Sequence, residues 1–161
     1  MKQVIYIGAP VGFVAAQTVL QGCAEVHEVP AETEAVSNAL RTASAMLDAS
    51  MKIEITKEMI QQAPDLRIIS CATTGSNHID HEASQVAGVA VRTLREDKAL
   101  LMNITPAAEL SWALLMACAR RLPAAVSHVQ EGLWVREDFP GLMLNGRRLG
   151  LVGCGRIGRF P

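Results

Sequence analysis

Short apolar runs rich in β-branched residues alternate with stretches of helical spacing over about the first hundred residues. Alternation of this kind predicts βαβ units, because each helix returns the chain so that the next strand can lie parallel to the previous one. The sequence therefore predicts an α/β fold in which helices cover both faces of a parallel sheet. The expected strands are residues 4–7, 25–29, 43–47, 66–72 and 89–91, and the expected helices are residues 13–20, 32–40, 56–62 and 82–87.

Capping residues support two of these helices. Thr56 is a favoured N-cap residue, and Glu58 lies in the first turn, where the helix dipole favours a negative charge. Asp80 is placed to cap the helix at 82–87, and Gly88 is placed to close it. Both helices should therefore begin close to these residues.

A change in pattern follows the fifth expected strand. Residues 95–98 form a charged cluster, which we expect to be an exposed boundary. Thr105 and Pro106 then suit the N-cap and the first position of a long helix that is apolar almost all round as far as residue 119. A helix of this kind is normally buried between layers or domains. A second helix is expected to continue to about residue 132.

A glycine-rich segment follows a short predicted strand at residues 148–152 and reads Gly153-Cys154-Gly155-Arg156-Ile157-Gly158. In a dinucleotide-binding fold the first glycine makes a tight turn, the second lets a pyrophosphate approach the backbone, and the third packs helix against strand. The phosphates then lie at free N–H groups of the helix N-terminus. An ordinary strand–turn–helix fits the local pattern equally well. The cofactor interpretation requires a bend that joins a strand to a helix.

A polar loop, Thr73-Thr74-Gly75-Ser76-Asn77, lies between a predicted buried strand and a predicted helix. Ligands of open α/β sheets bind beyond the carboxyl ends of the strands, so the hydroxyl and N–H groups of this loop are placed to hold a carboxylate. An ordinary βα turn is the equal alternative. Residues 8–12 lack the glycine spacing of a nucleotide loop and are predicted to form a turn.

Candidate metal ligands are few. His78, Asp80 and His81 lie close together, but Asp80 is better used as a helix cap and no fourth ligand is evident. The four cysteines are spread along the chain without a CxxC pair, so they predict neither a zinc site nor a disulfide framework. We therefore expect no metal.

Charge and hydropathy exclude further classes of protein. The chain carries 15 basic and 16 acidic residues, so it has no broad basic surface for nucleic acid. Its longest apolar run, near residues 110–119, is too short to cross a bilayer, and its first residues lead directly into a strand rather than a signal peptide. We expect a cytoplasmic protein that binds neither membrane nor nucleic acid.

Three stretches, in this order, resemble the D-isomer-specific 2-hydroxyacid dehydrogenases, the family that includes D-3-phosphoglycerate dehydrogenase. Residues 69–80 are similar to a family loop that leads into a helix. Residues 107–110 and 119–123 are similar to its interdomain helix, and residues 149–159 are similar to its NAD loop. Each motif is moderately specific, and the three in this order and spacing are a strong signal.

The resemblance implies two domains. Residues 1–98 would form a flavodoxin-like substrate domain, and residues 99–161 would supply the interdomain helices and the start of a Rossmann NAD-binding domain, with the active site between them. It implies NAD or NADP as the cofactor and a small 2-hydroxy or 2-oxo acid as the substrate. Glu109 matches a position in the interdomain helix and is expected to have a structural role.

The resemblance also implies site residues. The substrate contacts would come from one loop and the cofactor contacts mainly from the glycine-rich segment, where Arg156 and Ile157 would present amides to the pyrophosphate. The implied substrate-binding residues are Thr73, Thr74, Gly75 and Ser76, and the implied cofactor-binding residues are Thr74, Gly153, Gly155, Arg156, Ile157 and Gly158.

The catalytic Arg, Glu and His of the family all follow its glycine loop, so they are expected beyond residue 161 and none is assigned here. Residues 92–103 are longer and more charged than the corresponding family link. We therefore expect a truncated family member that has no turnover by itself.

A second interpretation is a non-catalytic α/β interaction module. Residues 1 to about 95 would fold alone, and the apolar helix after Thr105 would be a docking arm. An exposed apolar helix favours association, which a homodimer would satisfy. A homodimer is therefore expected.

Overall fold

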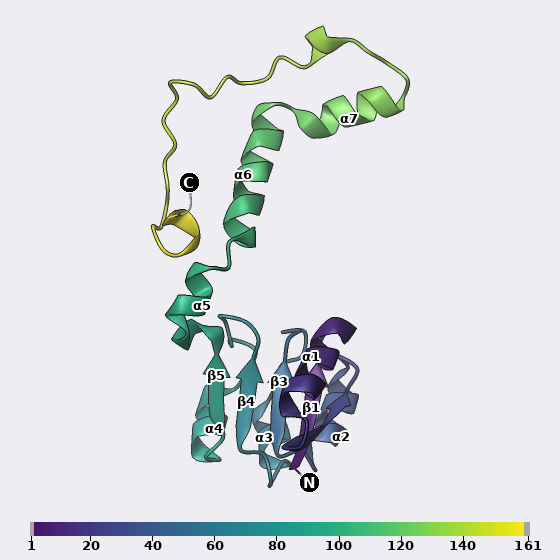
Figure 1. Ribbon diagram of the computed structural model, residues 1–161, viewed down its shortest axis with the longest axis vertical. Coiled ribbons are helices and arrows are strands. Elements are labelled where there is room, and N and C mark those ends of the chain that lie inside the picture. Colours follow the sequence, from purple (N-terminus) through teal and green to yellow (C-terminus); the bar gives the residue numbers. More distant parts are fainter. Residues whose placement is uncertain (1, 160–161) are drawn as a thin grey trace. The chain divides into compact units, whose positions relative to one another are not determined.

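The computed structural model of the protein describes residues 2–159. The chain divides into two compact units, Met1–Lys98 and Ala99–Pro161, called unit 1 and unit 2 below (Figure 1). Which unit binds a substrate and which binds a cofactor stays a prediction.

Unit 1 is built on a five-stranded sheet in the order β2-β1-β3-β4-β5, and every neighbouring pair is parallel (Figure 1). This is the strand order of flavodoxin-like folds, so the predicted fold class is confirmed for this unit. The strands are β1 (Lys2–Ile7), β2 (Ala24–Glu28), β3 (Ala45–Asp48), β4 (Ile68–Cys71) and β5 (Ala90–Thr93).

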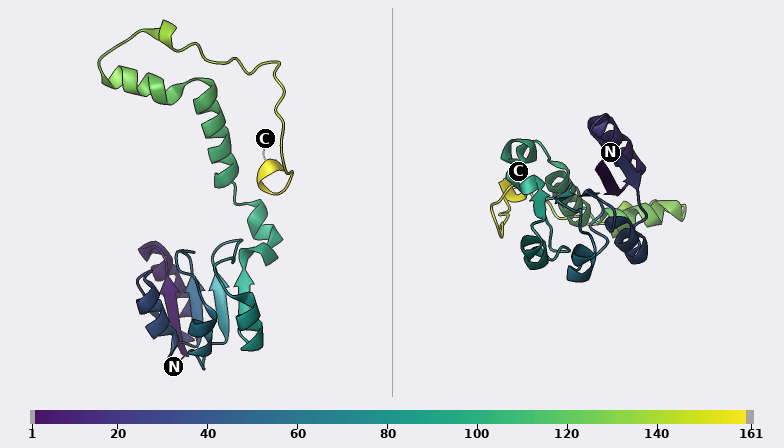
Figure 2. Two further views of the ribbon diagram at one scale, coloured as in Figure 1. Left: turned by 180° about the vertical axis from the view of Figure 1, so that it is seen from behind. Right: turned by 90° about the horizontal axis from the view of Figure 1, so that it is seen from below.

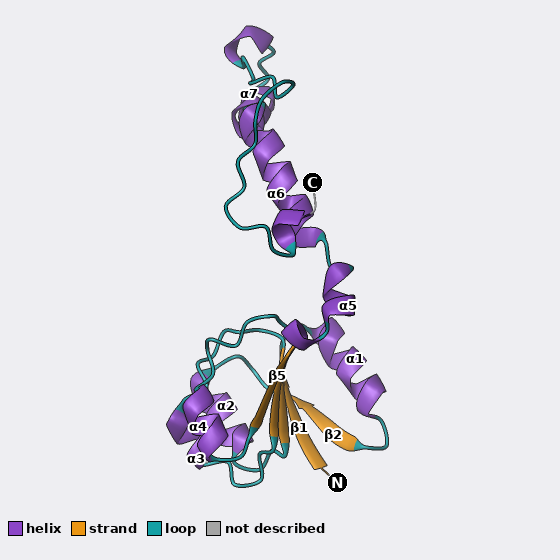
Figure 3. Ribbon diagram, turned by 90° about the vertical axis from the view of Figure 1, so that its left-hand side faces the viewer, coloured by secondary structure: helices purple, strands orange, loops and turns teal. Residues whose placement is uncertain are grey.

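Helices cover both faces of the sheet. Figure 3 shows α1 on one face and α2, α3 and α4 together on the other. The bounds are α1 (Pro10–Leu20), α2 (Thr33–Leu40), α3 (Lys57–Gln61) and α4 (His81–Val86), with a 3₁₀ turn, η1 (Leu94–Glu96), after β5.

The two faces bury cores of different size. The larger core packs against α2, α3 and α4, and its residues include Ile7, Leu40 and Ile69, all fully buried. The smaller core lies under α1, where Val4 and Tyr6 point to the other side of the sheet. Since successive side chains of a strand alternate between faces, β1 supplies both cores.

The predicted helix caps form. Thr56 Oγ1 accepts a hydrogen bond from Met59 N at 3.4 Å, and Asp80 Oδ1 accepts one from Ala83 N at 2.8 Å. Gly88 follows α4 with φ of 70°, a left-handed conformation that glycine adopts without strain. The caps therefore fix where α3 and α4 begin.

The turn predicted at residues 8–12 is wrong for residues 10–12, because α1 already begins at Pro10, and the bend is confined to residues 8 and 9. A Cβ at Gly8 would meet Tyr6 Oη and would lie 2.8 Å from Ala49 Cβ. A Cβ at Gly12 would also meet Tyr6 Oη, which donates to Ala9 O at 2.9 Å. Both glycines are thus required by the tyrosine ring beneath the start of α1.

Unit 2 contains helices and coil, and no strand forms within its described residues. The strand predicted at 148–152 is therefore wrong; this stretch is an extended coil (Figure 2). An isolated strand cannot pair its backbone N–H and C=O groups, and residues 99–159 offer no neighbouring strand. The elements are α5 (Lys98–Met102), α6 (Pro106–Ala119), α7 (Leu122–Gln130) and the 3₁₀ turns η2 (Arg136–Asp138) and η3 (Ile157–Arg159).

The start of α6 differs from the prediction. Thr105 has helical backbone angles and makes no side-chain cap; its hydroxyl instead donates to the Glu109 carboxylate one turn later. At the other end, Arg121 adopts the left-handed conformation (φ 54°) and separates α6 from α7. The predicted helix exists, but it begins without the cap that its sequence suggested.

Helix α6 is also less buried than its apolar composition predicted. Ala108 is its only buried residue, whereas Leu110 and Leu114 are 59% and 57% exposed. Lys98–Ala119 is long and apolar enough to cross a membrane by length and composition, which the run at 110–119 alone is not. The structure divides this stretch at residues 103–105. The 14 residues of α6 span about 21 Å, less than the roughly 30 Å core of a bilayer.

Candidate functional site

The carboxyl ends of the five strands meet at one edge of unit 1, because all the strands are parallel. Ligands of open α/β sheets bind at this edge, close to the point where the strand order reverses, which here lies between β1 and β3. Loops at residues 49–52 and 72–78 follow β3 and β4 there. The polar loop predicted to bind substrate thus lies at the expected edge.

Asp48 organises the loop after β3. Its side chain is 1% exposed, and Oδ1 accepts hydrogen bonds from Ser50 N at 2.7 Å, Ser50 Oγ at 2.9 Å and Met51 N at 3.1 Å. Met51 has φ of 55°, a left-handed conformation that costs about 1 kcal/mol or more for a residue other than glycine. The buried carboxylate therefore stabilises an otherwise unfavourable turn.

The same carboxylate binds the loop after β4. His78 Nε2 lies 2.7 Å from Asp48 Oδ2, and the histidine side chain is 10% exposed. The His78 carbonyl accepts from Ile55 N at 2.7 Å. Asp48 and His78 thereby hold the loops after β3 and β4 together at the sheet edge.

The three residues weighed as metal ligands have separate partners. His78 bonds to Asp48, Asp80 caps α4, and His81 Nε2 lies 3.0 Å from Ser76 Oγ. Within residues 2–159 no group of three His, Cys, Asp or Glu side chains is arranged to hold a metal ion.

The predicted substrate residues lie together in the loop after β4, but their hydroxyl groups differ in availability. Thr73 Oγ1 donates to Gly75 O at 2.8 Å, and Ser76 Oγ contacts His81 Nε2. The Thr74 hydroxyl has no hydrogen bond to any residue in the described part of the chain. Thr74 is therefore the hydroxyl of this loop that is free to bind a ligand.

Cys71, the last residue of β4, is not a nucleophile. Its side chain is buried, and burial together with the nearby charge of Asp48 raises the pKa of the thiol to about 11. Because the thiolate is the reactive form, this cysteine is inert at neutral pH.

Sequence reasoning did not find the pair of Asp48 and His78. The expected strand ended at Leu47, one residue before the aspartate, and His78 was considered only as a metal ligand. The available signal was a carboxylate directly after an apolar strand, at the edge where loops converge. Its partner is 30 residues away, so no local pattern joins the two.

The glycine-rich segment lies in unit 2. Gly153 has φ of 94°, and a Cβ at Gly158 would overlap the carbonyl oxygen of Gly153, so both positions require glycine. A Cβ at Gly155 would meet nothing within 4 Å, so the backbone there faces open space. The loop is therefore tightly folded around one accessible glycine.

The elements on either side of this loop are not those of the predicted strand–turn–helix. Coil precedes it, and the 3₁₀ turn η3 follows it where a helix was expected. The Arg156 guanidinium donates to Ile104 O, so its side chain is bonded within unit 2. A hollow of about 430 Å³ separates the loop from α6 and is lined by residues that include Trp112, Gly153 and Gly158. The bend from strand to helix that the cofactor interpretation requires therefore does not form in residues 148–159.

Two family sequence patterns match the chain. The pattern described as "D-isomer specific 2-hydroxyacid dehydrogenase, catalytic domain" matches residues 13–96. The pattern described as "D-isomer specific 2-hydroxyacid dehydrogenase, NAD binding domain" matches residues 112–160. The first includes the polar loop after β4, and the second includes the glycine-rich segment.

Similar proteins from other organisms are dehydrogenases by name, in agreement with the two family patterns. Over 106 residues, 66% of this chain, it is 38% identical to D-3-phosphoglycerate dehydrogenase of Rattus norvegicus. It is 37% identical over the same length to D-3-phosphoglycerate dehydrogenase of Mycobacterium bovis. The matched region spans 19% of the length of each relative.

Solved structures share the fold. A protein from Thermus thermophilus has a TM-score of 0.81 at 27% identity, over 99% of this chain and 50% of that one. A phosphoglycerate oxidoreductase from Vibrio cholerae has a TM-score of 0.70 at 26% identity, over 99% of this chain and 51% of that one. The chain therefore spans about half the length of these solved proteins.

Proposed function

Because the chain belongs to the D-isomer specific 2-hydroxyacid dehydrogenase family, we propose that it takes part in hydride transfer between a nicotinamide cofactor and C2 of a 2-hydroxy or 2-oxo acid. The observation that carries the proposal is the match of both family patterns, in order, over residues 13–96 and 112–160. The cofactor is NAD or NADP, and the protein is a cytoplasmic homodimer.

Unit 1 provides the substrate side. The free hydroxyl of Thr74 and the backbone N–H of Gly75 bind the substrate carboxylate, while Thr73 and Ser76 shape the loop through their own hydrogen bonds. Asp48 and His78 act through this loop as positioning residues, because they fix where it leaves the sheet.

Unit 2 provides the cofactor side. NAD or NADP supplies the carbon that accepts or gives the hydride, and the protein supplies orientation and charge. The strand and helix expected around the glycine-rich segment do not form, so the match of the NAD binding domain pattern over residues 112–160 carries this assignment. Open space at Gly155 fits a pyrophosphate that lies against the backbone, and the turn at Gly153 and Gly158 shapes that approach. The amides of Arg156 and Ile157 contribute to the same cradle.

The described residues assign no general base to this site, so we expect no turnover by the chain alone. The test is oxidation of NADH by the purified chain with a panel of 2-oxo acids. Steady turnover with any of them would contradict this part of the proposal, but would leave the family function intact.

Cofactor binding is tested by adding a side chain where the backbone is open. NADH fluorescence excited through tryptophan suits this test, because Trp112 and Trp134, the only tryptophans, both lie in unit 2. Gly155→Ala should abolish saturable binding. Gly150→Ala is the matched control, since a Cβ there also meets nothing within 4 Å but lies before the loop. Equal binding by both variants would contradict the assigned loop.

The exposed apolar surface of α6 favours a second candidate, a non-catalytic interaction module. Leu110 and Leu114 are more than half exposed, and such surface promotes association. This candidate predicts concentration-dependent dimers that NAD does not affect. The dehydrogenase proposal instead predicts that NAD raises the melting temperature, because a ligand that binds only the folded state stabilises it.

A further inference from the structure

A second hollow lies in unit 1, beside the carboxyl ends of β1, β2 and β3, and has a volume of about 600 Å³. That volume is in the usual range for small-molecule sites, roughly 300–1,000 Å³. It adjoins the point between β1 and β3 where the strand order reverses, the preferred ligand position in a sheet of this order. The loop after β4 does not line it.

Three of the residues that line this hollow, Ala9, Ala31 and Lys52, carry hydrogen-bond donors that have no partner in the described chain. The backbone N–H groups of Ala9 and Ala31 make no hydrogen bond within residues 2–159. The Lys52 ammonium also has no ion pair or hydrogen bond there. The Ser50 hydroxyl is already used, since it donates to Asp48 and accepts from Lys52 N, and this fixes the loop that carries the lysine. Two free amides and a cation suit an anionic group.

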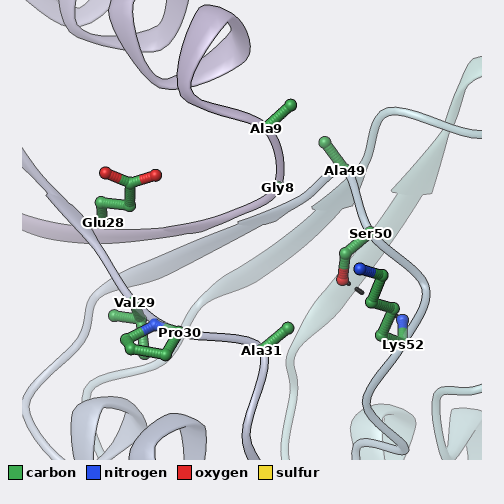
Figure 4. A pocket seen from close by; sticks show the side chains of 9 residues that line it. All are labelled: Gly8, Ala9, Glu28, Val29, Pro30, Ala31, Ala49, Ser50 and Lys52. Carbon is green, nitrogen blue, oxygen red and sulfur yellow. Dashed lines mark hydrogen bonds between the residues drawn. The ribbon is translucent and has the colours of Figure 1, made fainter.

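The Glu28 carboxylate, a hydrogen-bond acceptor, lies on the side of the hollow opposite Lys52 (Figure 4). Figure 4 shows Glu28 and Lys52 on opposite sides of the hollow, with Ala9 and Ala31 between them. The Glu28 carboxylate has no hydrogen-bond or ion-pair partner in the described chain, and its charge helps to raise the pKa of Tyr6, after the larger effect of burial. Glu28 ends β2 and lies 20 positions after Gly8. In dinucleotide-binding βαβ units an acidic residue at this place accepts hydrogen bonds from ribose hydroxyls.

We propose that this hollow binds a ribose 5′-phosphate group, as a mononucleotide carries it. Ala9 N–H, Ala31 N–H and the Lys52 ammonium hold the phosphate, and Glu28 accepts hydrogen bonds from the ribose hydroxyls. Because Lys52 and Glu28 lie on opposite sides of the hollow (Figure 4), the ligand must be elongated. Its anionic end lies at Lys52 and its hydroxyl-rich end at Glu28. The site is separate from the proposed pyrophosphate loop, because all of its residues belong to unit 1.

The experiment is a titration of the ¹⁵N-labelled 161-residue chain with adenosine 5′-monophosphate, followed by amide chemical shifts. We expect saturable shifts at Gly8, Ala9 and Ala31. Glu28→Gln and Lys52→Ala should each weaken binding about tenfold or more, the usual effect of losing a hydrogen bond to a charged group. Glu34→Gln and Lys57→Ala are matched controls on exposed residues outside the hollow and should bind as the parent chain does.

Three further ligands identify the group recognised. Ribose 5-phosphate should shift the same amides, whereas adenosine and inorganic phosphate should each bind at least about tenfold more weakly, because each lacks one half of the recognised group. Glu28 and Lys52 are exposed, so their variants should retain the parent spectrum. Shifts confined to residues 153–158, absence of saturation, or unchanged affinity in both variants would overturn the proposal. Loss of NADH binding in Gly155→Ala leaves it untouched, so the two sites are tested independently.

Discussion

The two units respond differently to equally clear sequence signals. In unit 1 every predicted strand finds parallel neighbours, and apolar residues gather in two cores. In unit 2 the predicted terminal strand is coil, and Ala108 is the buried residue of its longest helix. The difference shows that a sequence pattern typical of a strand or a buried helix produces that structure only where the chain also supplies a surface on which the strand or helix packs.

Truncating a buried and an exposed leucine tests this difference most strongly. Leu40 in α2 is fully buried, and Leu114 in α6 is 57% exposed. Leu40→Ala should lower the free energy of unfolding by about 2–5 kcal/mol, because it leaves a cavity in the core. Leu114→Ala should change it by less than about 0.5 kcal/mol. Urea denaturation followed by circular dichroism measures both, and similar losses would contradict the account.

Replacing one carboxylate in each unit by an amide compares a buried polar group with an exposed one. Asp48→Asn should lower the free energy of unfolding by about 1–3 kcal/mol, because the buried carboxylate accepts four hydrogen bonds. Glu109→Gln, which alters the exposed contact with Thr105, should cost less than about 0.5 kcal/mol. The same denaturation measurement applies. A neutral effect of Asp48→Asn would mean that the pair with His78 does not hold the loops.

Alkaline pH should destabilise unit 1 through its buried thiol. The pKa of Cys71 is raised from 9.0 to about 11, so between these values the folded chain holds a proton that the unfolded chain has lost. Stability from this group is therefore complete below pH 9 and declines as the pH rises toward 11. Cys71→Ala should flatten the decline in urea midpoint across that range. An unchanged slope in this variant would contradict the assignment.

Two threonines offer the finest comparison, since each precedes a helix in a different unit. Thr56 caps α3, so Thr56→Ala should cost about 1 kcal/mol of stability. Thr105 makes no cap, so Thr105→Ala should have an effect within about 0.5 kcal/mol. Thermal unfolding of both variants checks the order, and a larger loss for Thr105→Ala would reverse it.

Much of unit 1 was predictable because its apolar patterns and its helix-capping residues indicate the same strands and helices. The capping roles of Thr56 and Asp80 were correct, and each predicted strand exists. Strand ends were less predictable, because the ladder with the neighbouring strand sets them. The strand expected from residue 66 begins at Ile68, which pairs with Ala45, although Leu66 is buried.

The candidate site was predictable only in part. The loop at 73–77 follows its strand as expected, since the carboxyl edge of a parallel sheet is a general property. The bond between Asp48 and His78 joins two loops, and the hollow beside Glu28 and Lys52 joins three, so both arise from tertiary structure. The glycine-rich motif identified the family pattern correctly, whereas the strand and helix expected around it did not form.

Hydrogen–deuterium exchange tests the central comparison most directly. Amides of β3 and β4 should exchange only through global unfolding of unit 1, because they lie inside a paired and buried sheet. Amides of α6 and of residues 149–152 should exchange orders of magnitude faster, because little buried surface supports them. Protection of α6 amides equal to that of β4 would contradict the account.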